Sequence, residues 1–175
     1  MTSDWQQALA EHEAAIEACI AASRRVPDGK WNEAAADGKW SPAQHVEHVG
    51  LSYQMVIDAL DGRPPRARLG RGRQFFLRLF LLPKIIRTDV FRDGIPAPRE
   101  TRPIREPRDR ADVEAQLRAR ATRCIEVLLA SNTRGARVNH PYFGPLPLLD
   151  MLRLGTSHAR HHTGLLVRAV EAFGS

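Results

Sequence analysis

The sequence predicts an all-α fold, a four-helix bundle, on the strength of three observations. Four stretches of about twenty residues place apolar side chains at helical spacing. One long connection, rich in Pro and Arg, separates the second stretch from the third. No segment is rich in the residues and the alternation typical of strands. The chain of 175 residues is expected to be one domain, 1–175, because this length can bury a core without disulfides.

The first two helices are predicted in the N-terminal third. Residues 4–24 are rich in Ala, Glu and Gln, and the Pro-Asp-Gly sequence at 27–29 ends their pattern. The second helix is predicted over 42–60, before an Asp-Gly pair and two prolines. It begins with Pro, which is favoured at the first helical position, and Ser41 before it is a typical N-cap.

The connection 63–108 is expected to be an elaborated crossover between the second and third helices. Its periodicity is weak apart from a short helix around 74–86, and it has too few apolar residues for a separate core. The third helix is predicted over 110–130, with one apolar stripe. A tight turn at 140–145, with the sequence HPYFGP, then leads to the last helix, predicted over 146–173.

The net charge is +6 and the sequence pI is about 10.1, so an acidic partner has to be considered. Much of the excess lies in the connection 63–108. A solvated basic loop is the simplest interpretation, and a surface that binds phosphate or anionic lipid is the alternative. Five arginines of this loop could bind an anionic substrate: Arg71, Arg73, Arg99, Arg102 and Arg105. Nucleic acid is the less favoured partner.

Cellular location follows from the cysteines and the apolar segments. Cys19 and Cys124 lie within helical patterns without paired spacing, which indicates reduced core residues. The N-terminus lacks the basic and apolar segments of a secretory leader. The longest apolar stretch, 75–86, is interrupted by Arg78 and Pro83 and is shorter than the ~20 residues of a span. We therefore expect a cytoplasmic protein without a membrane span.

Two of the predicted helices carry histidines on their apolar face. On a wheel of about 100° per residue, His158 and His162 lie about 40° apart, in the stripe of Met151. On the second helix, His48 lies in the stripe of Met55. Side chains four residues apart on one helix can reach a single ion. These three histidines are therefore the candidate metal ligands, and hydrogen-bonded core histidines are the alternative interpretation.

Other residues are expected to border this site. His45 and His161 lie about 60° to the side of the inward histidines, which predicts a second shell or a pocket rim. Tyr142, on the turn before the last helix, is a further candidate for the rim. Trp40 is interpreted as a packing anchor at the start of the second helix. No catalytic acid or base can be assigned, and the two shoulder histidines are the only titrating candidates nearby.

The residue types favour a transition metal. Neutral imidazole binds zinc, nickel, iron or copper, whereas calcium and magnesium prefer oxygen. We expect a divalent ion, zinc or nickel. Three protein nitrogens leave a coordination position open, as in catalytic sites, where the metal activates water or a thiolate. A zincin peptidase is not expected, because Ala159 stands where the HExxH motif has its Glu.

The motifs WSPAQHVEHV at 40–49, HPYFGPL at 140–146 and HARHHTGLL at 158–166 together resemble the DinB-like superfamily of bacterial metal-dependent proteins. The closest resemblance is to an uncharacterised branch with an HPxFG turn before the last helix, and it covers nearly the whole chain. It implies an up-down-down-up bundle, a metal on His48, His158 and His162, and a homodimer, since many members are dimers. Leu165 departs from the Gln that members often have there.

The resemblance also implies a range of activities. Some relatives are thiol S-transferases that use low-molecular-weight bacterial thiols, one isomerises maleylpyruvate, and most have no assigned reaction. The sequence therefore predicts a metal-dependent transferase or hydrolase that acts on a small molecule. The alternative is a non-enzymatic helical binding module that uses the basic loop for an acidic partner.

Overall fold

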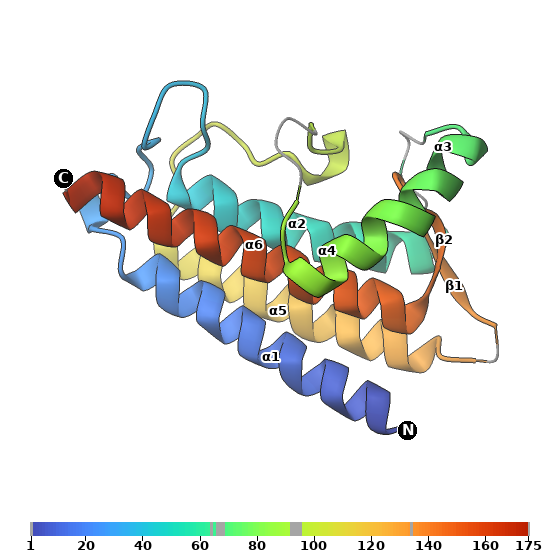
Figure 1. Cartoon of the computed structure of the whole chain (residues 1–175). Helices are drawn as coiled ribbons and strands as arrows, with labels where there is room; N and C mark the ends of the chain where they lie inside the picture. The colour runs from blue at the N-terminus through green and yellow to red at the C-terminus, as the bar shows by residue number, and fades with distance from the viewer. Residues whose placement is uncertain (1, 64, 66–68, 92–95, 134, 175) are drawn as a thin grey trace.

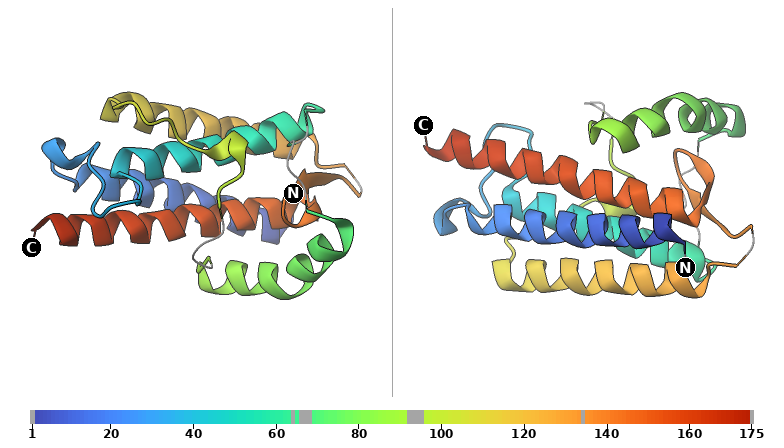
Figure 2. Two further views of the ribbon diagram at one scale, coloured as in Figure 1. Left: turned by 90° about the horizontal axis from the view of Figure 1, so that it is seen from above. Right: turned by 60° about the horizontal axis from the view of Figure 1, so that its bottom comes forward.

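In the computed structural model the chain is mostly helical, with one two-stranded antiparallel sheet. The structure describes residues 2–63, 65, 69–91, 96–133 and 135–174. Four long helices form the body: α1 (Ser3–Arg24), α2 (Pro42–Leu60), α5 (Arg110–Ala130) and α6 (Leu148–Gly174). Figures 1 and 2 show α1 and α6 running in one direction and α2 and α5 running in the other. No helix of the described residues is long and apolar enough to cross a membrane.

Local signals set the beginning of α2. The Gln44 N–H donates to Ser41 Oγ at 3.3 Å, and the Ser41 N–H donates to Gln44 Oε1 at 3.0 Å. This reciprocal pair is a capping box, which satisfies two backbone donors that the first helical turn leaves without partners. Pro42 occupies the first turn, where its missing N–H costs nothing. The predicted N-cap at Ser41 is confirmed.

The core lies between the long helices. The most extensive packing joins α1 to α6 and α2 to α5, and α2 also packs against α6. Large apolar side chains from all four helices are fully buried there: Ile20, Val46, Leu117, Leu128 and Leu166. Cys19 and Cys124 are free and buried, as predicted. Burial raises the pKa of the Cys19 thiol to about 11 and that of Cys124 to about 12, so both stay protonated at neutral pH.

The segment 137–147 corrects the expectation of purely helical structure. The predicted tight turn is the tip of a β-hairpin formed by β1 (Arg137–His140) and β2 (Gly144–Pro147). Val138 pairs with Leu146, and both side chains are buried. A single inward apolar residue in each strand is too little to produce a recognisable alternation in the sequence. As a result α6 begins at Leu148, and not at the predicted 146.

The crossover contains a longer helical segment than predicted. It comprises α3 (Arg71–Phe76), the π-helical turn η2 (Leu77–Leu81) and α4 (Leu82–Thr88), and α4 packs on the outer side of α6 (Figure 2). Pro83 has no N–H, and its ring crowds the carbonyl four residues earlier, which gives a local reason for the wider turn before it. Further along, the short turn η3 (Arg99–Thr101) packs on α2. Residues 64, 66–68 and 92–95 of this connection lie outside the described residues.

Candidate metal centre

The three predicted metal ligands converge where α2 faces α6. His48 comes from α2, and His158 and His162 come from successive turns of α6. His158 Nε2 lies 3.2 Å from His48 Nε2 and 3.1 Å from His162 Nε2. One nitrogen from each ring lies within 4.8 Å of the other two, so the cluster could hold a metal ion. It is the one such group of three or more His, Cys, Asp or Glu residues in the described parts of the chain.

The spacing of these nitrogens fits a transition metal. Zinc binds imidazole nitrogen at about 2.0–2.1 Å, and in a tetrahedral site two such nitrogens lie about 3.3 Å apart. The observed separations of 3.1 and 3.2 Å are close to this value. The donor set is nitrogen only, which suits zinc or nickel better than magnesium or calcium. The residues present therefore fit the group that the sequence predicts.

The crossover segment orients the ring of His48. His48 Nδ1 donates to the backbone carbonyl of Thr101 at 2.6 Å, which leaves Nε2 without a proton and free to bind a metal. The segment is held on α2 by the buried carboxylate of Glu47. This carboxylate accepts from the Ile104 N–H at 3.1 Å and from Arg108 Nη1 at 3.3 Å. The connection 63–108, which was interpreted from the sequence as a solvated basic loop, thus supplies the carbonyl that orients His48.

His45 is placed to orient the ring of His162, as the Thr101 carbonyl orients the ring of His48. The two Nδ1 atoms lie 3.0 Å apart. A ligand nitrogen at His162 Nε2 requires the proton of that ring to be on Nδ1, so His162 donates and His45 accepts. The second-shell role of His45 stays a prediction, and this contact is the one through which His45 would act on a ligand ring. The pKa of His45 is lowered to about 4, chiefly by burial.

Two aromatic side chains flank the histidines. The ring of Trp40 lies 4.7 Å from the ring of His48 and 5.6 Å from that of His45, between ring centroids. Phe91, which follows α4, lies 5.3 Å from His158 and 5.2 Å from His161. Both aromatic residues are half-buried. Trp40 therefore packs on the cluster itself, whereas Phe91 was not predicted, because its position in the crossover carries no periodic signal.

Burial keeps the imidazoles in the form that binds metal. Loss of hydration lowers the pKa of His48 to about 4, although its bond to Thr101 acts in the opposite direction. Burial and the neighbouring rings lower the pKa values of His158 and His162 well below the ordinary value. At neutral pH these rings are uncharged, and each has a nitrogen lone pair available for a ligand.

The remaining predicted rim residues lie in different places. His161 is half-buried beside Phe91, and its ring centroid is 5.4 Å from that of His162. Tyr142 donates its hydroxyl to the Pro96 carbonyl at 2.5 Å, so it ties the hairpin to the crossover. His140, in contrast, accepts backbone N–H bonds from Tyr142 and Phe143, and burial lowers its pKa to about 3. The hairpin tip is thus arranged by His140, a role that the sequence pattern did not reveal.

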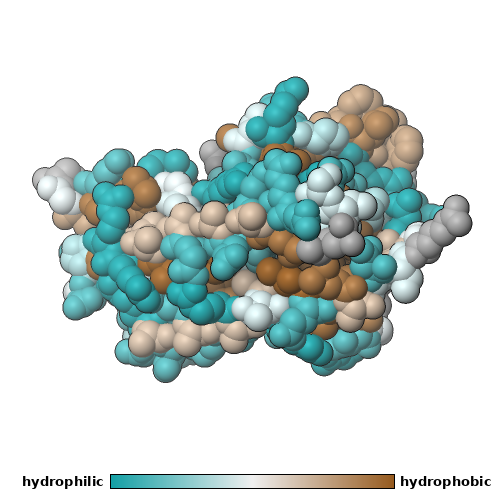
Figure 3. Space-filling model, turned by 90° about the horizontal axis from the view of Figure 1, so that it is seen from below, coloured by the Kyte–Doolittle hydropathy of each residue, from teal (hydrophilic) through white to brown (hydrophobic). Residues whose placement is uncertain are grey.

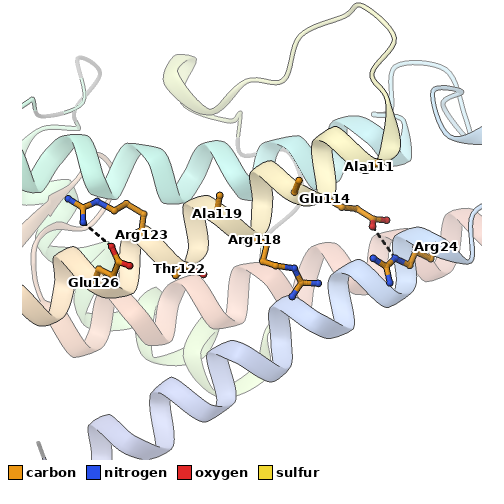
Figure 4. Close-up of a pocket in the computed structure, with 9 residues that line it drawn as sticks. Arg24, Ala111, Glu114, Arg118, Ala119, Thr122, Arg123 and Glu126 are labelled. Atoms are coloured by element: carbon orange, nitrogen blue, oxygen red, sulfur yellow. Dashed lines mark hydrogen bonds and ion pairs between the residues drawn. The ribbon is translucent and has the colours of Figure 1, made fainter.

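An open groove of about 570 Å³ lies elsewhere, along α5 and the end of α1 (Figure 4). Its charged side chains largely neutralise one another: Arg24 pairs with Glu114 at 2.9 Å and Arg123 with Glu126 at 2.8 Å. No histidine lines it. The groove offers no group suited to chemistry, so we assign the candidate site to the histidine cluster and not to this groove.

Fold and site together define a helical protein with a three-histidine cluster suited to a metal ion. The model of the DinB superfamily matches residues 7–166, which is most of the chain. The chain therefore belongs to the DinB superfamily, a group of metal-binding proteins, as its motifs had indicated. No curated protein and no solved structure matches it.

Proposed function

We propose that this protein is a divalent-metal-dependent enzyme whose ion is held by His48, His158 and His162. The observation that carries the proposal is the convergence of three Nε2 atoms, with separations of 3.1 and 3.2 Å between neighbours. Such a set leaves coordination positions open, unlike a closed structural site. Zinc or nickel is the ion that this donor set favours.

The residues around the ligands support a reactive site over a merely structural one. The Thr101 carbonyl and His45 each fix one ligand ring by a hydrogen bond, which is typical of sites whose ligand geometry is tuned. Trp40 and Phe91 flank the cluster with apolar rings, which would contact the apolar portion of a small substrate bound at the ion. A bound divalent ion would lower the pKa of water or of a thiol, giving a nucleophile at neutral pH.

We propose a thiol S-transferase or a hydrolase as the reaction class. The buried thiols of Cys19 and Cys124 have raised pKa values, so the chain itself offers no ready sulfur nucleophile. A transferase of this kind would therefore take its thiol from a low-molecular-weight cosubstrate. His161, half-buried at the edge of the cluster, is the side chain best placed to exchange a proton with that cosubstrate.

Metal content tests the site. The purified wild-type protein is expected to contain about one zinc or nickel per chain, and zinc added after chelation should raise its melting temperature. His158→Ala should lose the metal and this response. His161→Ala, a neighbour on the same helix that is not in the ligand set, should keep both. If wild type carries no metal and added zinc or nickel neither binds nor stabilises it, the proposal is wrong.

Activity tests the reaction class separately. The metal-loaded protein is incubated with a low-molecular-weight thiol and an alkyl halide, and loss of free thiol is followed against chelated protein and His158→Ala. Hydrolysis is followed with small ester and amide substrates. Turnover that depends on the metal supports the enzyme. Metal binding without turnover on either panel would favour the alternative, a binding module without catalysis.

Several broader features belong to this proposal. The directions of α1, α2, α5 and α6 support an up-down-down-up four-helix bundle as one domain over the chain. Homodimer formation is proposed on the family resemblance alone, and sedimentation equilibrium measures it directly.

A further inference from the structure

The outer side of the helical segment 71–88 carries an unusual concentration of exposed apolar side chains. Four of the seven large hydrophobic residues that are exposed in the described chain lie within six positions: Phe75, Phe76, Leu79 and Phe80, at 51, 62, 53 and 67% exposure. Isolated exposed apolar residues are normal on a protein surface, but a contiguous group indicates an interaction site. Figure 3 shows a hydrophobic projection at the upper right, where this segment lies.

The side chains of this apolar group face outward, and its aromatic rings contact one another. The rings of Phe76 and Phe80 stack, with centroids 6.1 Å apart and planes 16° from parallel, and Phe75 packs edge-on against Phe76 at 6.0 Å. The opposite side of the segment is anchored in the body through the buried side chains of Leu82 and Ile85. The segment therefore already has a buried face, and the exposed aromatic face is surplus to the packing of the monomer.

Basic residues accompany the exposed rings. Between positions 63 and 88 the sequence contains eight Arg or Lys residues and no Asp or Glu. Arg73, Lys84 and Arg87 are exposed. Together with Phe76 and Phe80 they follow one another at intervals of three or four residues, so they share one side of the helical segment. We call these five residues, with Phe75 and Leu79, the aromatic–basic face.

We propose that the aromatic–basic face binds the surface of a lipid bilayer that contains anionic headgroups. A short helix with aromatic and Leu side chains on one side and flanking Arg and Lys is suited to lie in the plane of the interface. Phe76, Phe80 and Leu79 would enter the acyl boundary, while Arg73, Lys84 and Arg87 would contact lipid phosphates. The segment lies on the surface of the bilayer and does not span it.

The charge of the face favours a bilayer over a second copy of this chain. In a symmetric dimer the same patch meets itself, so the basic side chains of this face would oppose one another without acidic partners nearby in the segment. A nucleic acid would satisfy the charges but would leave the outward Leu79 and the mutually stacked rings in water. An anionic bilayer accommodates both the charge and the apolar area.

Vesicle flotation with the full chain tests the proposal. The wild-type protein is expected to float with vesicles of phosphatidylcholine and phosphatidylglycerol at 3:1, and not with phosphatidylcholine alone. Binding should weaken in 0.5 M NaCl, because salt screens headgroup attraction. The double variant Phe76→Ser, Phe80→Ser should bind at least about tenfold more weakly, since it lacks the two rings that would be buried in the bilayer. Leu129→Ser, at an exposed apolar position on α5, should bind as wild type does.

A second pair of variants tests the contribution of the basic residues. Arg73→Glu, Lys84→Glu and Arg87→Glu together should abolish flotation. Arg25→Glu, Lys39→Glu and Arg137→Glu change the net charge equally at exposed positions outside the segment and should reduce it far less. Circular dichroism melting checks that each variant is folded. Metal content should be the same in the folded variants as in the wild type, because none of the substituted residues is a candidate ligand, so this test is independent of the proposed enzyme activity.

Three outcomes overturn the proposal. One is the absence of flotation with anionic vesicles at low salt. Another is a concentration-dependent dimer that the Phe76→Ser, Phe80→Ser variant loses while vesicles bind neither protein, which would assign the face to a second copy. The third is tight, salt-sensitive binding of a DNA oligonucleotide that the charge variant loses while wild type fails to float, which would assign it to nucleic acid.

Discussion

His45 Nδ1 lies 3.0 Å from His162 Nδ1, so a histidine of α2 orients a candidate metal ligand of α6. The same α2–α6 interface brings His48 to His158 on the preceding turn of α6. The interface thus carries both the candidate ligands and one of the groups that orient them. The packing of α2 against α6 therefore determines the geometry of the histidine cluster.

His45→Ala should weaken zinc binding about 10- to 100-fold, because His162 loses the acceptor that fixes its ring. His45→Asn should recover part of the affinity, since the amide oxygen can accept from His162 Nδ1 in nearly the same position. Competition with a chromophoric chelator measures both affinities. Equal affinities for wild type and His45→Ala would show that the contact does not orient the ligand.

Glu47→Ala should lower the free energy of unfolding by about 3 kcal/mol, because it removes a buried carboxylate that holds Arg108 and the Ile104 N–H. Zinc affinity should fall as well, since the Thr101 carbonyl is carried by the same segment. Glu33→Ala, which removes an exposed ion pair with Lys30, is the control and should cost less than about 1 kcal/mol. Urea unfolding of the metal-free proteins measures the loss of stability separately from the loss of zinc affinity.

His12 should make the protein sensitive to mild acid. Its ring is buried against Tyr53, and neither nitrogen has a hydrogen-bond partner among the described residues. Burial lowers its pKa from 6.5 to about 4, so between these values the unfolded chain binds the proton and the folded chain does not. The resulting loss of stability begins as the pH falls below about 6.5 and is complete, at about 3 kcal/mol, below about 4.

His12→Phe keeps an aromatic contact with Tyr53 and removes the titrating group. The wild type should lose free energy of unfolding between pH 7 and pH 5, and the variant lacks this loss. The difference in free energy of unfolding, variant minus wild type, should therefore increase by about 2 kcal/mol over this range. The other buried histidines titrate equally in both proteins and cancel in the difference. Urea unfolding at the two pH values gives this difference directly, and a constant difference would contradict the assignment.

Gly144→Ala should destabilise the hairpin more than Gly135→Ala. Both glycines have positive φ, 69° and 82°, which costs a residue with a Cβ about 1 kcal/mol. At Gly144 the added Cβ would also lie 2.9 Å from Gln74 Oε1, whereas nothing lies within 4 Å at Gly135. Gln74 is buried and donates to the Pro141 carbonyl at 3.1 Å, so it cannot move away freely.

We expect a loss of about 1 kcal/mol for Gly135→Ala and about 2–3 kcal/mol for Gly144→Ala, measured by urea unfolding. Similar losses at the two positions would mean that backbone strain alone acts, and that the contact between the hairpin and α3 is unimportant.

The sequence by itself determined the long helices and the direction in which their histidines point. An N-cap at Ser41 followed by Pro42 and an apolar repeat are local signals, and helical geometry converts the spacing of His158 and His162 into a shared face. For this reason the three candidate ligands could be chosen from wheels drawn for each helix separately.

Only the tertiary structure decided what surrounds them. The bond from His48 to the Thr101 carbonyl joins residues 53 positions apart, and the contact of His45 with His162 spans 117 positions. The positions of Phe91 and of the 137–147 hairpin likewise depend on partners that are distant in the chain. No periodic pattern encodes such contacts, because they arise when separate elements pack and bury one another's polar groups.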